Sequence, residues 1–140
     1  MSKKERKDRR SAGFTLIELM IVIAILGMMA YMVAPRLMGV MGKAKPKITQ
    51  ADIKNLETAI DLFYLDVGRY PTDEEGLKAL YQRPDNMPNW AGPYIKTAPK
   101  DPWGREYVYK FPGERGAYDI YSYGADGQPG GEGENTDIAN

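Results

Sequence analysis

The feature that most constrains this chain is a single long apolar run near its N-terminus. From Phe14 to Ala34 there are 21 residues and one charged side chain, Glu18. A helix of this length is roughly 30 Å long at ~1.5 Å per residue, which matches the hydrocarbon core of a bilayer. The run can therefore cross a membrane. About a hundred residues follow it, enough for a small water-exposed domain without a deep core.

The charges before the run indicate its orientation. The first ten residues hold six of the 19 Lys and Arg residues and two of the 19 Asp and Glu residues, so the remainder has 13 against 17, a net charge of −4. A short basic stretch beside a membrane run keeps that side cytoplasmic. Because the rest of the chain is mildly acidic, this stretch is not a nucleic-acid patch, and we expect no nucleic-acid partner.

Two export signals compete with the membrane-anchor interpretation. A cleaved secretory signal has a shorter apolar region, about 7–15 residues, that ends at an A-x-A-like site. Neither condition is met cleanly here. The pair Arg9-Arg10 is compatible with a twin-arginine signal, but a run this apolar with an internal carboxylate fits that class poorly.

Glu18 is the anomaly of the run, because a carboxylate in hydrocarbon costs ~2.5–3.5 kcal/mol on insertion scales. One interpretation is that Glu18 lies near the membrane edge and reaches the headgroups. The other is cleavage between Gly13 and Phe14, which gives Phe14 a positive amine that can pair with Glu18 of a neighbouring subunit. Truncating one partner of such a buried pair typically costs about 3–5 kcal/mol, so the pair would fix the axial register between copies.

The basic leader, Gly13 and the segment Phe14-Thr15-Leu16-Ile17-Glu18 resemble the signature of type IV pilins and pseudopilins. The resemblance implies that a prepilin peptidase cuts after Gly13 and methylates the amine of Phe14. It also implies that Phe14 and Glu18 guide assembly of the subunits into a helical filament.

Beyond the run, Pro35 lacks an N–H group and clashes with the preceding turn, and Gly39, Gly42 and Pro46 follow. We therefore expect a locally melted stretch between a membrane half and a soluble half of one long helix. A plain linker is the alternative.

The soluble part predicts an α+β fold. Ile53, Leu56, Ile60 and Phe63 recur at three- and four-residue spacing, which predicts an amphipathic helix that packs one stripe onto a sheet. Thr72 and Glu75 have capping-box spacing, which predicts a short helix beginning at Thr72. The alternating runs 106–111 and 117–123 predict two antiparallel strands. The expected fold class is thus a long N-terminal helix packed on a small antiparallel sheet, with a calcium-stabilised C-terminal loop.

Three further segments resemble the major pseudopilins of type II secretion, in order along nearly the whole chain: Arg69-Tyr70-Pro71-Thr72, Asp101-Pro102-Trp103-Gly104 and residues 122–127. The resemblance implies a cleaved leader (1–13), a transmembrane assembly helix (14–34) and a periplasmic head (35–140). It implies a single-pass inner-membrane protein whose filament drives export across the outer membrane. The implied partners are further copies, minor pseudopilins, the prepilin peptidase and the inner-membrane assembly platform.

The C-terminal segment 123–140 has five glycines, four acidic residues and almost no apolar residue, so left alone it should be disordered. Ca²⁺ takes 6–8 oxygen ligands, and this composition supplies them, although the EF-hand spacing is absent. A disordered acidic tail that binds no cation is the alternative. The resemblance implies a structural Ca²⁺ held by five residues, with Thr136 where the family often has an acid and Glu134 as a possible substitute. The expected ligands are the side chains of Asp126 and Asp137, the carbonyls of Tyr123 and Gln128, and Thr136.

The composition also restricts catalysis. The chain has no Cys and no His, which excludes a disulfide framework, a thiolate zinc site and the commonest general base. No nucleophile motif is visible, so we expect no enzyme. Two other functions stay open: a type IV pilin of an extracellular fibre, and a membrane-anchored periplasmic binding domain that uses the tyrosine-rich sheet as a monomer.

Overall fold

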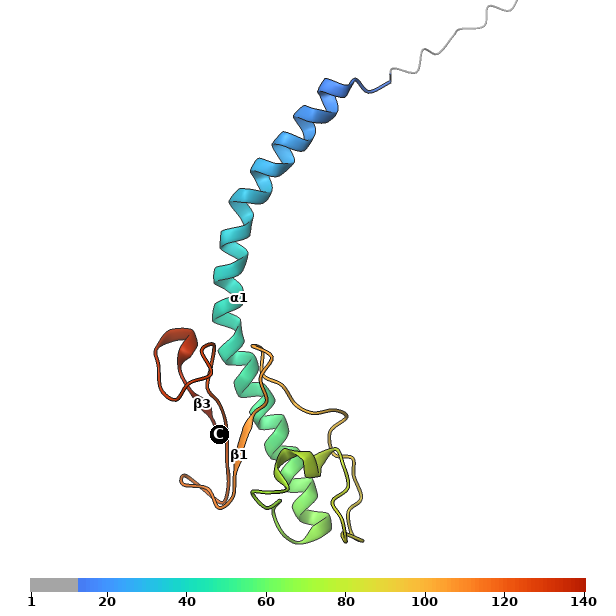
Figure 1. Cartoon of the computed structure of the whole chain (residues 1–140), viewed down its shortest axis with the longest axis vertical. Helices are drawn as coiled ribbons and strands as arrows, with labels where there is room; N and C mark the ends of the chain where they lie inside the picture. Colours follow the sequence, from blue (N-terminus) through green and yellow to red (C-terminus); the bar gives the residue numbers. More distant parts are fainter. Residues whose placement is uncertain (1–12) are drawn as a thin grey trace, which may run out of the picture. The chain divides into compact units, whose positions relative to one another are not determined.

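The computed structural model describes residues 13–140, so the leader predicted for residues 1–13 lies outside the described residues except for Gly13. The chain divides into two compact units, and the division falls between Gly39 and Val40. One helix, α1 (Leu16–Val67), contributes its first part to one unit and its second part to the other (Figure 1). The sequence placed the start of the head at Pro35, where the hydropathy changes.

The predicted melted stretch is wrong for this structure. Residues 35–46 are helical throughout, including Pro35, Gly39, Gly42 and Pro46. A proline removes one backbone donor and crowds the preceding turn, and this local cost was the basis of the prediction. The residues around the two prolines are mostly Ala, Leu, Met and Lys, which are strong helix formers.

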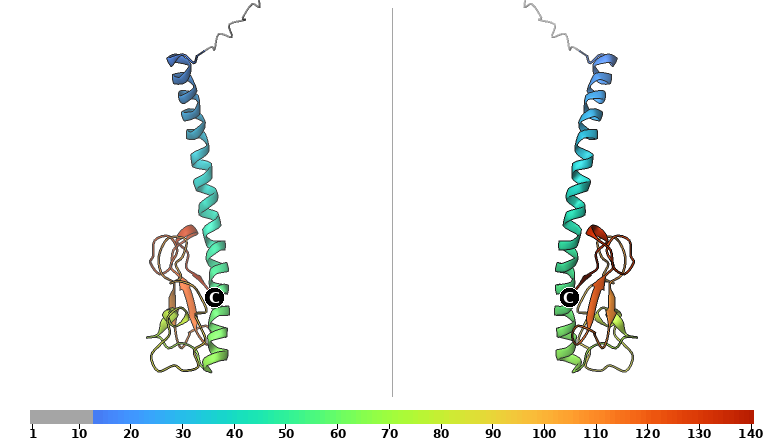
Figure 2. Two further views of the ribbon diagram at one scale, coloured as in Figure 1. Left: turned by 90° about the vertical axis from the view of Figure 1, so that its right-hand side faces the viewer. Right: turned by 90° about the vertical axis from the view of Figure 1, so that its left-hand side faces the viewer.

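The second unit is built on the predicted apolar stripe. Ile53, Leu56, Ile60 and Phe63 are all buried, with 4% or less of each residue exposed. They face a three-stranded antiparallel sheet that lies along one side of the C-terminal part of α1 (Figure 2). The amphipathic helix and its packing on a sheet are therefore confirmed.

The sheet has the order β1-β2-β3, with strands Val108–Lys110, Asp119–Ser122 and Ile138–Ala139. Tyr109 pairs with Ile120, and Ser122 pairs with Ile138. The two predicted strands exist but are shorter than their alternating runs, and Pro112 cannot donate to the ladder beyond β1. The third strand was not predicted, because its two residues follow a glycine-rich segment that shows no alternation.

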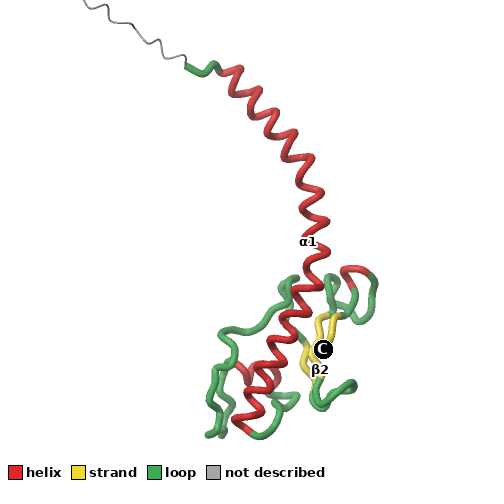
Figure 3. The backbone as a smooth tube through the Cα atoms, turned by 180° about the vertical axis from the view of Figure 1, so that it is seen from behind, coloured by secondary structure: helices red, strands yellow, loops and turns green. Residues whose placement is uncertain are grey.

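Short 3-10 helices and loops complete the head, and loops make up most of its chain (Figure 3). The helix η1 (Gly76–Leu80) buries Leu77, Ala79 and Leu80. Ahead of it, Thr72 and Glu75 exchange the two hydrogen bonds of a capping box: the Thr72 N–H donates to Glu75 Oε2 at 2.9 Å, and the Glu75 N–H donates to Thr72 Oγ1 at 3.2 Å. The predicted box is present, but the helix is a 3-10 helix that begins at Gly76. The helix η2 (Gly133–Asn135) lies in the C-terminal loop.

Candidate assembly and cation sites

The start of α1 is closed by two reciprocal hydrogen bonds between Thr15 and Glu18. The Thr15 N–H donates to Glu18 Oε2 at 3.1 Å, and the Glu18 N–H donates to Thr15 Oγ1 at 3.3 Å. This is a capping box, so within one chain the Glu18 carboxylate already has a partner. We did not predict it, although Thr15 and Glu18 have the same spacing as Thr72 and Glu75. No ion pair among residues 13–140 involves Glu18.

The apolar surface of α1 is uncovered within the chain. Every large apolar side chain from Phe14 to Met41 is exposed, and the exposed fraction runs from 44% at Val22 to 83% at Phe14. Among the described residues, α1 is the one helix long and apolar enough to cross a membrane. A continuous apolar surface of this extent marks contact with lipid or with other protein.

The C-terminal loop runs from Gly124 to Asp137 and is closed on itself. The Ala125 N–H donates to the Glu134 carbonyl at 2.9 Å. Gly124 has φ 69°, and a Cβ there would lie 2.7 Å from that same carbonyl oxygen. A glycine is needed at this position both for its backbone conformation and for the close approach of the returning chain.

The two predicted carboxylate ligands lie at opposite ends of this loop, and both residues are exposed. Asp126 Oδ1 accepts the Gln128 N–H at 3.1 Å, and Asp137 Oδ2 accepts the Gly130 N–H at 2.9 Å. Each carboxylate therefore commits one oxygen to the loop backbone. Within residues 13–140, no three acidic side chains gather closely enough to form a ready metal centre. The Glu134 carboxylate lies against Gly42 of α1.

A buried carboxylate anchors the first residue of the loop. Asp101, 5% exposed, accepts the Trp103 N–H at 3.1 Å, the Arg105 N–H at 2.9 Å and the Ser122 hydroxyl at 2.6 Å. Ser122 Oγ in turn accepts the Gly124 N–H at 3.2 Å, while Arg105 Nη1 donates to the Gly124 carbonyl at 2.8 Å. Asp101, acting through Ser122, and Arg105 thus hold Gly124 by both of its backbone polar groups.

Comparison with known proteins decides the family. The chain matches the family "Type II secretion system (T2SS), protein G" over residues 36–140 and the "Prokaryotic N-terminal methylation motif" over residues 8–34. The chain belongs to the type II secretion system protein G family.

Members of this family from several bacteria align with nearly the whole chain. The type II secretion system core protein G of Vibrio cholerae is 47% identical over 138 residues, covering 96% of this chain and 94% of that protein. The core protein G of Pseudomonas aeruginosa is 43% identical, covering 94% of this chain and 96% of its own. These protein G relatives confirm the resemblance to type II secretion pseudopilins.

A solved structure supports the same fold. The major pseudopilin of the type 2 secretion system of enterohaemorrhagic Escherichia coli is 40% identical, with a TM-score of 0.61. The alignment covers 76% of this chain and 94% of that one. The α+β class, with one long helix and a small antiparallel sheet, is thereby confirmed for this chain. The calcium-stabilised loop that completed the predicted fold stays a prediction.

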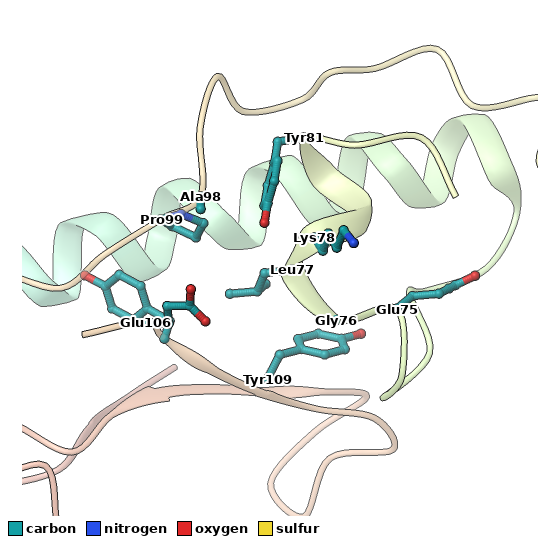
Figure 4. A pocket seen from close by; sticks show the side chains of 10 residues that line it. Glu75, Gly76, Leu77, Lys78, Tyr81, Ala98, Pro99, Glu106 and Tyr109 are labelled. Carbon is teal, nitrogen blue, oxygen red and sulfur yellow. The ribbon is translucent and has the colours of Figure 1, made fainter. Parts of the chain in front are cut away.

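A cavity of about 300 Å³ in the head is a further place to look for a ligand. It lies between η1, β1 and the segment around Pro99, and the Tyr81 hydroxyl and the Glu106 carboxylate point into it (Figure 4). Other polar groups in its wall serve the fold: the Tyr109 hydroxyl donates to the Pro71 carbonyl at 2.8 Å, and burial raises the pKa of Tyr109. Glu75 is paired with Arg69 at 2.8 Å. Lys78, Tyr81 and Glu106 also line the wall, and no hydrogen bond or ion pair found among residues 13–140 joins their side chains.

Proposed function

We propose that this protein G family member is the repeating subunit of a type II secretion pseudopilus, anchored in the inner membrane before it assembles. The observation that carries the proposal is the uncovered apolar surface from Phe14 to Met41 beside a head that buries its own core. Lipid covers such a surface in the membrane, and other copies of the same helix cover it in a filament. The filament drives export across the outer membrane, with minor pseudopilins and an inner-membrane platform as further partners.

Glu18 changes partners in this proposal. In a single chain its carboxylate accepts the Thr15 N–H within the capping box. After a prepilin peptidase removes the leader at Gly13, Phe14 carries a positive amine, which is methylated. The amine of a neighbouring copy carries a full positive charge that the Thr15 N–H lacks, so it adds a coulombic attraction to the hydrogen bond and neutralises the carboxylate in surroundings of low dielectric constant. The match of residues 8–34 to the methylation motif supports this processing.

The test combines mass and assembly. The full chain is expressed with and without a prepilin peptidase, and its intact mass and N-terminal sequence are measured. We expect the processed chain to begin at methylated Phe14. Filament assays then compare the wild type with Glu18→Gln and, as a control on the head, Glu74→Gln. Filaments should disappear only in Glu18→Gln. Retention of residues 1–13, or normal assembly of Glu18→Gln, contradicts the proposal.

For the C-terminal loop we propose a Ca²⁺ site formed by Asp126, Asp137 and Thr136 with the carbonyls of Tyr123 and Gln128. The donor set fits a hard cation, because it consists of carboxylate, hydroxyl and carbonyl oxygens. Asp126 and Asp137 each use one oxygen within the loop, which leaves a second oxygen available, and neither forms an ion pair among the described residues. When bound, Ca²⁺ offsets the repulsion between the carboxylates and stabilises the closed loop.

This site is tested on the full chain in detergent micelles. Ca²⁺ should raise the melting temperature and slow amide hydrogen exchange in residues 124–137 relative to a chelator. Asp126→Asn and Asp137→Asn should lose that response, whereas Asp85→Asn, an exposed acid elsewhere in the head, should keep it. No change of either signal in the wild type contradicts the site.

The other functions considered are less well supported. The relatives and the solved structure reported above are type II secretion proteins, which favours a pseudopilus subunit over a pilin of an extracellular fibre and over a membrane-anchored monomeric binding domain. Family members are structural subunits of a secretion system, and the expectation that this chain has no enzymatic activity follows the family.

A further inference from the structure

We propose that two lysines at the start of the head, Lys43 and Lys47, which with Lys45 between them form the lysine triad, bind the anionic headgroups of the membrane that anchors the subunit before assembly. This inference rests on the proposed membrane anchoring, but not on filament assembly or on Ca²⁺. None of the three lysines is among the residues proposed above for assembly or for Ca²⁺.

The first observation is the distribution of charge along the chain. Between Glu18 and Asp52 there are four basic residues and no acidic one, and three of the four form the triad. The triad follows the uncovered apolar side chains directly, since Met41, 63% exposed, precedes Lys43 by two residues. Nine positions separate Lys43 from Ala34 at the end of the 14–34 run, roughly 14 Å of helix, and long lysine side chains extend their charges back toward the headgroup level.

The second observation is that the chain supplies no counter-charge. Residues three and four positions away are neighbours on a helix surface, and none of these neighbours of the triad is acidic. The three ion pairs among residues 13–140 lie elsewhere in the head. Glu134 is the acid that comes up to α1 here, and its carboxylate lies against Gly42 without pairing to a lysine.

The third observation is the orientation of the three side chains. Lys43 and Lys47 are exposed and four residues apart, so they lie on one face of α1. Like charges at this spacing repel each other, which an external anion relieves. Lys45 points elsewhere, with Nζ 5.8 Å from the centroid of the Trp103 ring. Lys43 and Lys47 are therefore the two lysines free to meet a surface.

An anionic phospholipid surface suits this arrangement better than a discrete ligand. Basic residues next to a membrane gain about 1 kcal/mol each from anionic lipid, which is about fivefold in binding per lysine. The gain needs no built pocket, only charge near the surface, and it weakens with salt because the screening length shortens. The predicted loss for Lys43 and Lys47 together is about 30-fold.

The test uses the full chain purified in zwitterionic detergent. It is mixed with equal amounts of phosphatidylglycerol and phosphatidylcholine of the same acyl chains, and native mass spectrometry measures the ratio of retained lipids. The wild type should retain phosphatidylglycerol preferentially, and added salt should reduce the preference. In the double variant Lys43→Gln/Lys47→Gln, the ratio of retained phosphatidylglycerol to retained phosphatidylcholine should fall by up to about 30-fold. Lys43→Arg/Lys47→Arg should keep it, because the charge is kept.

The control is Lys96→Gln/Lys100→Gln, which removes two exposed lysines from another part of the head. Its lipid preference should equal that of the wild type. Equal retention of both lipids by the wild type, or an equal loss in the control, overturns the proposal. If Lys43→Gln/Lys47→Gln keeps the preference but no longer associates with other copies, the triad contacts protein instead and the lipid proposal is wrong. Because the assay contains neither a peptidase nor Ca²⁺, failure here leaves the processing and the loop proposals untouched.

Discussion

The two parts of α1 both carry large apolar side chains and differ in what covers them. Ile23 lies in the first part and is 61% exposed, whereas Ile60 lies in the second part and is fully buried. Both belong to one continuous helix, so helix propensity does not separate them. The second part finds its partners in η1 and the sheet of the same chain, while the first part must find them outside the chain. The second stretch of α1 thus stabilises the fold of the head, and the first stretch is left to associate with lipid or with other copies.

The largest expected effect comes from the matched variants Ile60→Ala and Ile23→Ala. Ile60→Ala should lower the free energy of unfolding of the head by about 2–5 kcal/mol, because it removes buried atoms and leaves a cavity. Ile23→Ala should leave that free energy unchanged and weaken association between copies. Urea unfolding of the full chain in micelles, followed by tryptophan fluorescence, measures the head alone, since Trp90 and Trp103 both lie there. An equal loss in both variants would break the comparison.

The second prediction concerns Asp101, a buried polar residue of the head whose hydrogen-bond partners all lie in the same chain. Asp101→Ala should lower the free energy of unfolding by about 3 kcal/mol, since it leaves three donors without an acceptor. The exposed Asp85 provides the control, and Asp85→Ala should change the free energy by less than about 0.5 kcal/mol. Amide exchange should rise in the C-terminal loop first, because Asp101 holds Gly124 through Ser122. Unchanged exchange in that loop would show that the turn does not anchor it.

A smaller effect separates backbone conformation from close packing in the loop. Gly124 and Gly133 have φ of 69° and 61°, so alanine is strained at both positions by about 1–2 kcal/mol. A Cβ at Gly124 would also meet backbone atoms, whereas nothing lies within 4 Å of a Cβ at Gly133. Gly124→Ala should therefore be less stable than Gly133→Ala by a further ~1–3 kcal/mol in the same unfolding measurement. Equal losses would mean that the returning chain does not pack on Gly124.

Local patterns in the sequence predicted the amphipathic helix, two of the three strands and the second capping box, but not the contacts that link them. The stripe of Ile53 to Phe63 and the box of Thr72 and Glu75 depend on residues three or four apart, and both were found. The contacts of Asp101 with Ser122 and of Tyr107 with Asp52 join residues 21 and 55 positions apart, and no local pattern encodes them. The prediction of a melted stretch at residues 35–46 was wrong because it considered only the local effect of proline. It did not weigh the strong helix formers on either side of both prolines.

The smallest effect concerns the pH dependence of the head. Arg69 donates two hydrogen bonds of 2.8 Å to the two carboxylate oxygens of Glu75. These bonds lower the pKa of Glu75 from 4.5 to about 2, with a further contribution from the Thr72 N–H. Because the pKa is lower in the folded state, the pair stabilises the head above pH 4.5, and this stabilisation is lost as the pH falls from about 4.5 through about 2.

The side chains of Arg69 and Glu75 are 45% and 22% exposed, so screening by solvent limits the effect to about 1 kcal/mol or less. Arg69→Gln should flatten the fall in the free energy of unfolding between pH 5 and pH 2.5. Lys110→Gln is the matched control, since its partner Glu114 lies 3.6 Å away and is 81% exposed, and it should leave the slope unchanged. An unchanged slope in Arg69→Gln would assign the acid sensitivity to other carboxylates of the head. Since both partners belong to the head, the slope should be the same for the single subunit and for assembled copies.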